Sequence, residues 1–115
     1  MVVPDLKFPF VNQLEATVAR LPASSIFVVV APPVFSGALP TRHTSEAANK
    51  AQCNSALAKA AATRMGSLFL DFADDNEMTR DPANFIDATH YRAKIARYME
   101  ASISKALAGA VRADP

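Results

Sequence analysis

The chain has 115 residues, half of them apolar, which suits a single folded domain with its own core and argues against disorder. Its twelve basic and eleven acidic residues leave a net charge of +1. Because the basic residues form no stripe or cluster, the composition argues against a nucleic-acid partner. The longest apolar stretch, Ile26 to Phe35, contains two prolines and is too short to span a bilayer.

Compartment and redox chemistry are only weakly constrained. The first ten residues, MVVPDLKFPF, have neither the basic region nor the long apolar region of an export signal. Cys53 is the single cysteine, so an internal disulfide is excluded. Its alanine-rich surroundings favour a small, buried apolar side chain.

The first predicted element is a helix that Asp5 can cap and Pro22 ends. Apolar residues recur at helical spacing along it, with polar residues between them. They are Leu6, Phe10, Leu14, Val18 and Leu21.

A strand, a loop and a second helix are expected next. The run IFVVV, residues Ile26–Val30, is β-branched without polar alternation, which predicts a strand covered on both faces. APPVFSGALP then interrupts regular structure. Thr44 or Ser45 can cap an alanine-rich helix from about Glu46 to Arg64, and Gly66 is placed to end it as the C′ residue.

The remainder predicts a second strand and a last helix. Ser67–Phe72 is again apolar on both faces except at Asp71, and a polar loop follows it. The last helix presents one apolar face. That face consists of Ile95, Met99, Ile103 and Leu107.

The expected order is therefore helix, strand, helix, strand, helix. Strands joined through a helix form a right-handed crossover and a parallel pair. Because both strands are apolar throughout, they need helices on both faces and further strands beside them. This order predicts an α/β fold in one domain over residues 1–115, part of a three-layer α/β/α, flavodoxin-like parallel sheet.

The stretch NFIDATHYR places Asp87 three residues before His90. In serine-type hydrolases an imidazole takes the proton of the nucleophile while a carboxylate fixes its tautomer. An acid and a histidine at this spacing, on a loop that enters a helix, can form such a pair. The alternative is that Asp87 or Thr89 caps the helix and His90 is a partly solvated residue of its first turn.

A strand ending in Asp71-Phe72, a polar loop, NFIDATHYR and a C-terminal amphipathic helix together resemble the end of the SGNH (GDSL-type) hydrolase family. The phrase is most similar to the branch that includes alginate-type O-acetyltransferases of the bacterial cell envelope. Upstream, IFVVVAPPV resembles the family's penultimate strand and the loop after it. The likeness covers about residues 5 to 108, and its specific part is the D-x-x-H block.

The resemblance implies that His90 is the general base of a Ser-His-Asp triad and Asp87 its orienting partner. In the family, the nucleophilic serine and the oxyanion-hole residues lie on earlier strands. This sequence holds no such block before its first helix, so we expect a C-terminal half that is inactive alone. The implied function is hydrolysis or transfer of acyl esters, of carbohydrate by analogy, and the implied location is the envelope or periplasm.

Two further residues are weaker candidates for substrate contact. Ser36 lies in a glycine-containing loop after a strand, where it is either a substitute nucleophile or an ordinary turn residue. Arg92 can meet an anionic substrate, pair with Asp87 or remain in water. His43 is interpreted as a surface histidine.

Nothing in the sequence predicts a cofactor or a metal site. The acidic residues of the polar loop lack the spacing of metal ligands and are interpreted as solvated. A second hypothesis for the whole chain is a catalytically inactive α/β module that binds another chain through its sheet edge. On either hypothesis, a two-stranded sheet predicts self-association or pairing with a missing N-terminal half.

Overall fold

The computed structural model describes residues 6–113. The chain divides into two compact units. Unit 1 comprises Met1–Val29 and Pro40–Phe69, and unit 2 comprises Val30–Leu39 and Leu70–Pro115. Each unit is built from two separate stretches of sequence, because the chain passes from unit 1 to unit 2, returns to unit 1 and then enters unit 2 again.

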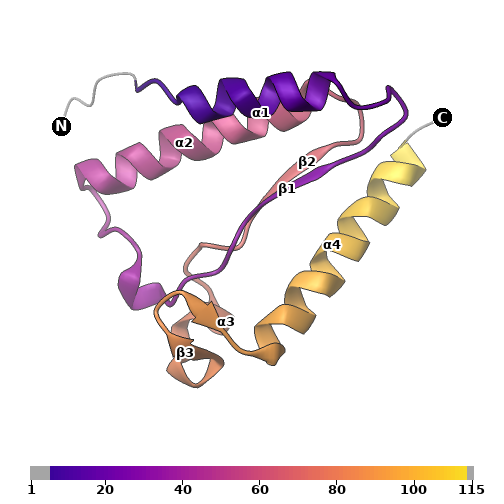
Figure 1. Ribbon diagram of the computed structural model, residues 1–115. Coiled ribbons are helices and arrows are strands. Elements are labelled where there is room, and N and C mark those ends of the chain that lie inside the picture. Colours follow the sequence, from indigo (N-terminus) through magenta and orange to yellow (C-terminus); the bar gives the residue numbers. More distant parts are fainter. Residues whose placement is uncertain (1–5, 114–115) are drawn as a thin grey trace. The chain divides into compact units, whose positions relative to one another are not determined.

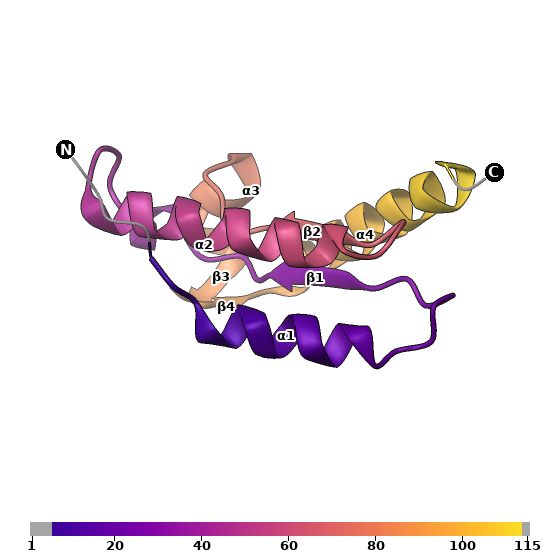
Figure 2. The ribbon, with the colours of Figure 1, turned by 90° about the horizontal axis from the view of Figure 1, so that it is seen from above.

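In unit 1, helices α1 (Pro9–Ala19) and α2 (Ser45–Ala62) lie side by side (Figures 1 and 2). They run in the same direction. The Leu6 amide, just before α1, donates to Oε1 of Gln52 in the middle of α2 at 2.8 Å, and an Arg64 guanidinium N–H, just after α2, donates to the Val18 carbonyl near the end of α1 at 2.9 Å. Small residues allow this approach, since Ala60 and Ala61 are each 1% exposed.

The buried stripe of α1 differs from the predicted one. Val11 and Val18 are buried and Leu14 is half-buried, whereas Phe10 is 51% exposed and Leu21 is 40% exposed. Phe10 lies one residue, about 100°, away from Val11 around the helix, so the two cannot share a face. Pro9 occupies the first turn and Phe8 is the N-cap residue. The proposed cap Asp5 lies outside the described residues.

Arg64 closes the end of α1. Its guanidinium donates to the carbonyl oxygens of Val18, Leu21 and Pro22. Carbonyls in the last turn of a helix have no intrahelical partner, and a cation there also opposes the helix dipole. Arg64, which follows α2 in the sequence, therefore caps the carboxyl end of α1.

The cap of α2 follows the prediction, but its end does not. The Thr44 side chain accepts from the Ala47 amide at 3.2 Å. The helix ends at Ala62, and Gly66 lies in a later turn that the Ser67 amide closes on the Arg64 carbonyl at 3.1 Å. Gly66 adopts a φ of 81°, which suits the third residue of a type II turn. Its left-handed conformation thus serves the entry to the next strand.

Strands β1 (Val28–Ala31) and β2 (Leu68–Asp71) form a parallel pair, as predicted. In unit 1 the Leu68 amide donates to the Phe27 carbonyl, and in unit 2 the Phe72 amide donates to the Ala31 carbonyl. Both bonds join residues 41 apart, the constant offset of a parallel register. Every residue of both strands is half-buried, so the expected full burial on two faces is wrong here.

Unit 2 contains short elements where the sequence predicted a loop. Its segments are η1 (Ser36–Ala38), α3 (Glu77–Arg80), η2 (Pro82–Asn84), β3 (Phe85–Asp87), β4 (His90–Tyr91) and α4 (Ala93–Ala113). The Asn76 side chain accepts from the Met78 and Thr79 amides, which starts α3, and the Asp81 side chain accepts from the Ala83 amide, which starts η2.

The predicted apolar face of α4 is confirmed. Ile95 is 1% exposed, and Met99, Ile103 and Leu107 are half-buried. Nearby, the ring of Tyr98 meets Phe72 edge to face at 6.0 Å. Together with Phe85 and Pro33, these residues form the apolar part of unit 2.

Candidate functional site

Asp87 and His90 face each other across a tight hairpin rather than on a loop that enters a helix. Strands β3 and β4 are antiparallel, with Asp87 paired to His90 and Phe85 paired to Tyr91. Ala88 and Thr89 form the two-residue turn between them. Residues paired directly across antiparallel strands have Cβ atoms about 5 Å apart, so the register itself brings the two side chains together.

The predicted contact between the acid and the histidine is present. His90 Nδ1 lies 2.7 Å from Asp87 Oδ1 and 2.8 Å from Oδ2. Since a carboxylate only accepts, Nδ1 must carry the proton of this hydrogen bond. The His90 side chain is 70% exposed and that of Asp87 58% exposed, so the pair lies at the surface. No hydrogen bond engages Nε2 within the described part of the chain.

Asp87 also organises the turn. Its Oδ1 accepts from the backbone amides of Thr89 and His90, each at 3.0 Å. The carboxylate therefore caps the hairpin turn, an arrangement characteristic of aspartate in turns, and does not cap α4. The same bonds fix where the carboxylate oxygens sit relative to the imidazole.

These donors act on the carboxylate electrostatically. They lower the pKa of Asp87, first through the hydrogen bond from the His90 side chain and next through the Thr89 backbone amide. A donor stabilises the ionised carboxylate, which is why the shift is downward.

The hairpin is attached to the segment that leaves the carboxyl end of β1. The Phe35 amide donates to the Ala88 carbonyl at 2.8 Å, and the rings of Phe35 and Phe85 meet edge to face at 5.9 Å. Gly37 permits this placement, because a Cβ there would lie 2.6 Å from Cε2 of Phe35. Polar groups beyond a strand's carboxyl end are where α/β sheets commonly hold their sites.

A small hollow opens beside the pair, with a volume of about 220 Å³. Apart from the carboxylate, its side chains are aromatic or aliphatic. The lining residues are Phe35, Pro82, Phe85, Ile86, Asp87 and Ala88.

The weaker candidates lie apart from the histidine ring. Ser36 Oγ is hydrogen-bonded to Thr79 Oγ1 at 2.8 Å and has no bond to His90. The Arg92 backbone amide donates to the Asn84 carbonyl at 2.8 Å. The Arg92 side chain is exposed and has no hydrogen bond or ion pair among residues 6–109.

Acidic residues of the loop have structural partners. Asp75 forms an exposed ion pair with Arg80 at 2.8 Å, Asp74 accepts from the Asn76 side chain, and Asp71 accepts from the Ala73 amide. Over the residues that the structure describes, no group of three or more potential ligands could hold a metal ion. His43 is exposed and has a φ of 64°.

Sequence reasoning missed two buried polar residues that support the hairpin. The Thr79 hydroxyl donates to the Asp74 carbonyl at 2.7 Å, accepts from the Asn76 amide at 3.0 Å and meets Ser36. The Asn84 amide donates to the Met78 carbonyl at 2.8 Å. The pattern Asn-x-x-Thr from residue 76 was a usable signal for a helix start.

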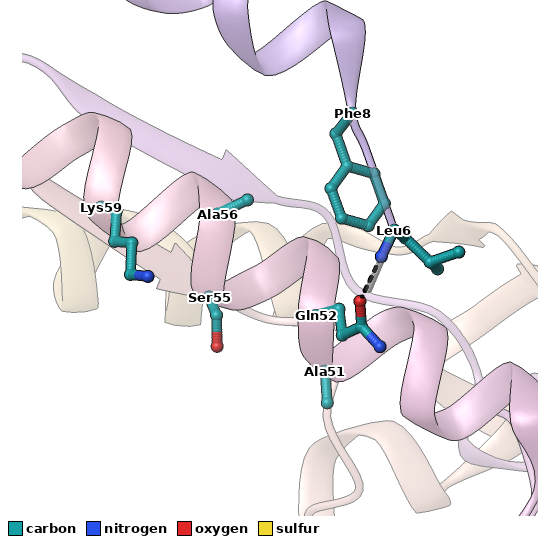
Figure 3. A pocket seen from close by; sticks show the side chains of 7 residues that line it. All are labelled: Leu6, Phe8, Ala51, Gln52, Ser55, Ala56 and Lys59. Atoms are coloured by element: carbon teal, nitrogen blue, oxygen red, sulfur yellow. Dashed lines mark hydrogen bonds between the residues drawn. The ribbon is translucent and has the colours of Figure 1, made fainter. Parts of the chain in front are cut away.

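Unit 1 has a larger hollow of about 500 Å³ along α2 (Figure 3). Its sides are Leu6 and Phe8 before and at the start of α1, and Ala51, Gln52, Ser55, Ala56 and Lys59 of α2. Lys59 is its one charged side chain, and neither histidine lines it.

Comparisons of the chain with protein-family models, curated proteins and solved structures found no match. Among the described helices, none combines the length and apolarity that crossing a membrane requires.

Proposed function

We propose that this chain carries the acid–base part of an SGNH-type ester hydrolase or O-acetyltransferase that acts on acyl esters of carbohydrate. The observation that carries the proposal is the hydrogen bonding of the Asp87 carboxylate oxygens to His90 Nδ1, at 2.7 and 2.8 Å, while no described residue bonds to Nε2. The sequence resemblance around NFIDATHYR supplies the reaction class.

The chemistry follows from the tautomer. With the proton on Nδ1 directed at Asp87, the lone pair of Nε2 is available to take a proton from a hydroxyl nucleophile. The carboxylate then stabilises the imidazolium that forms. Because both groups are exposed, an acyl ester and its acceptor can approach from solvent.

The reaction also needs a nucleophile and oxyanion donors. Ser36 is engaged by Thr79, and the family resemblance assigns the nucleophile to an earlier strand. We therefore propose that β1 and β2 are the later strands of a larger three-layer parallel sheet. Without the nucleophile, the 115-residue chain should not turn over esters, because a base alone has no hydroxyl to activate.

Stoichiometric acylation by an activated ester tests the pair without a serine. With p-nitrophenyl acetate, Nε2 attacks the carbonyl carbon, p-nitrophenolate leaves, and the N-acetylimidazolium loses its Nδ1 proton to solvent. Without a serine, water should hydrolyse the resulting N-acetylimidazole to acetate and imidazole more slowly than the assay lasts, so that each chain reacts once. We expect the single-turnover rate to fall to background in His90→Ala and severalfold in Asp87→Asn. The measurements are p-nitrophenolate release and the mass of the acetylated peptide.

His43→Asn is the matched control, since Asn tolerates the left-handed backbone at that position. It should leave the rate unchanged. Equal rates in His90→Ala and the wild type, or equal acetylation of both histidines, would contradict the proposal.

The alternative function is an inactive module that pairs through its sheet edge, and the half-buried apolar strands favour it. Exposed strand edges present unpaired amides and carbonyls to another chain. The occupant would be the strands of a second copy. Sedimentation should then show dimers, and amides of Val28–Ala31 should exchange more slowly at high protein concentration. A monomer with concentration-independent exchange would exclude this function.

A further inference from the structure

We infer that the hollow beside Asp87 binds the acyl chain of the ester, and that this chain is short and apolar. The inference rests on the proposed function, because it assigns the hollow to the acyl part of the same substrate. Its support is the position, chemistry and size of the hollow.

The hollow lies beside the acid–histidine pair. Asp87 lines the hollow and is also hydrogen-bonded to His90 Nδ1. A ligand in the hollow would therefore contact the residue that orients the imidazole. Ala88 also belongs to both, since it lines the hollow and forms the turn between the two residues of the pair. Phe35 also lines the hollow, and its backbone amide donates to the Ala88 carbonyl.

The chemistry of the lining selects an apolar ligand. Five of its six side chains are apolar, and the sixth, Asp87, accepts from the imidazole and two backbone amides. No uncommitted side-chain donor lines the hollow, so a hydroxylated or anionic ligand would lose hydrogen bonds to water there. A sugar therefore fits poorly and a hydrocarbon chain fits well.

Size limits the chain. A volume of about 220 Å³ corresponds to roughly seven molecules of liquid water, each taking about 30 Å³. That space encloses a short chain, whereas most of a long fatty acyl group would lie outside it.

Ile86 is an exposed apolar residue in the lining of the hollow. It is 68% exposed, follows the buried Phe85 and precedes the exposed Asp87. It is among the most exposed large apolar side chains of the described residues. A chain that enters the hollow covers part of this side chain, which adds apolar contact without moving the backbone.

A series of methyl ketones of increasing length tests the inference, because ketones carry the acyl skeleton but no leaving group. We expect the affinity to rise about fourfold for each added methylene and then to stop rising once the hollow is full. NMR titration should report the binding through the Ile86 methyl groups and the Phe35 and Phe85 rings.

Ile86→Ser should weaken binding and flatten the series, and the substitution is safe for folding because the side chain is exposed. Ile26→Ser is the matched control, since Ile26 is 39% exposed and lies in unit 1. An affinity that ignores chain length, or a series unchanged by Ile86→Ser, would overturn the inference.

The two proposals fail separately. A flat ketone series together with acylation that depends on His90 overturns the acyl-chain site and leaves the proposed function standing. Graded ketone binding together with acylation that ignores His90 overturns the proposed function, and with it the assignment of the bound chain as an acyl group.

Discussion

Unit 1 packs α1 against α2 through small apolar side chains, whereas unit 2 joins short segments through buried polar ones. In unit 1, the closest packing involves Val11, Val18 and the alanines of α2, and Arg64 closes the helix end. In unit 2, Thr79 and Asn84 are 2% and 5% exposed and hold η1, α3 and η2 through hydrogen bonds.

The difference concerns function because the acid–histidine pair and the apolar hollow both lie in unit 2. Hydrogen bonds are directional, so they can fix a hairpin and two loops without long helices or strands. Such a unit is easily destabilised by substitution, because removing one partner of a buried hydrogen bond leaves the other partner unsatisfied. Loss of a buried polar group should therefore destabilise unit 2 in addition to loss of apolar packing, whereas unit 1 should respond to loss of packing and of its cap.

The largest effect should come from the apolar part of unit 2. Ile95→Ala removes the most deeply buried large side chain, 1% exposed, and should lower the free energy of unfolding by about 3 kcal/mol. Urea unfolding measures the loss, and hydrogen exchange should show it in the amides of unit 2. Ile103→Ala, at a half-buried position of the same helix, should cost clearly less. Equal losses would mean that Ile95 is not a core residue.

Thr79→Val tests the polar support at nearly constant shape. The Asn76 amide and the Asp74 carbonyl lose their partner, which should cost about 2 kcal/mol. Thr17→Val is the control, because its exposed hydroxyl donates to the Gln13 carbonyl within one helix. If Thr79→Val were no more destabilising than Thr17→Val, polar side chains would not be what holds unit 2 together.

Arg64→Met keeps the aliphatic stem and removes the three donors to the end of α1. Because these bonds are partly or fully exposed, the loss should be about 1 kcal/mol and should appear as faster exchange in the last turn of α1. Arg20→Met, an exposed arginine of the same unit, should have no effect. Unchanged exchange in Arg64→Met would show that solvent caps the helix equally well.

The sequence predicts unit 1 better than unit 2 for a physical reason. Periodicity reveals long helices and apolar strands, and the order of the main elements, the parallel pair and the Thr44 cap were all predicted. Phe10 was misplaced because Phe10 and Val11 are both apolar, and spacing alone does not decide which of them is buried. In unit 2 the elements have four residues or fewer until α4, too few to show a period.

The contact between Asp87 and His90 could be predicted from the sequence, but the hairpin that carries them and the hollow beside them could not. The spacing of Asp87 and His90 predicted their contact, and the structure has it. The hairpin was missed because its turn, Ala88-Thr89, lacks the Asn-Gly or Asp-Gly signal. The hollow depends on Phe35 meeting Phe85, residues fifty positions apart, which no local pattern encodes. The catalytic role of the pair remains a prediction.

The smallest expected effect is the pH dependence of the pair. The pKa of Asp87 is lowered in the folded protein, chiefly by His90, from an unfolded value of about 3.9. A depressed carboxyl pKa stabilises the fold above the unfolded value, and this contribution is lost as the pH falls through the folded value. It should therefore disappear below about pH 4. Carboxyl-carbon NMR should show the Asp87 pKa rising in His90→Ala, but only part of the way, because the Thr89 amide still donates. His43→Asn should leave the titration of Asp87 unchanged. An Asp87 pKa that is the same in His90→Ala would mean that the turn amides alone hold the carboxylate ionised, and that the hairpin is an aspartate-capped turn beside an independent histidine.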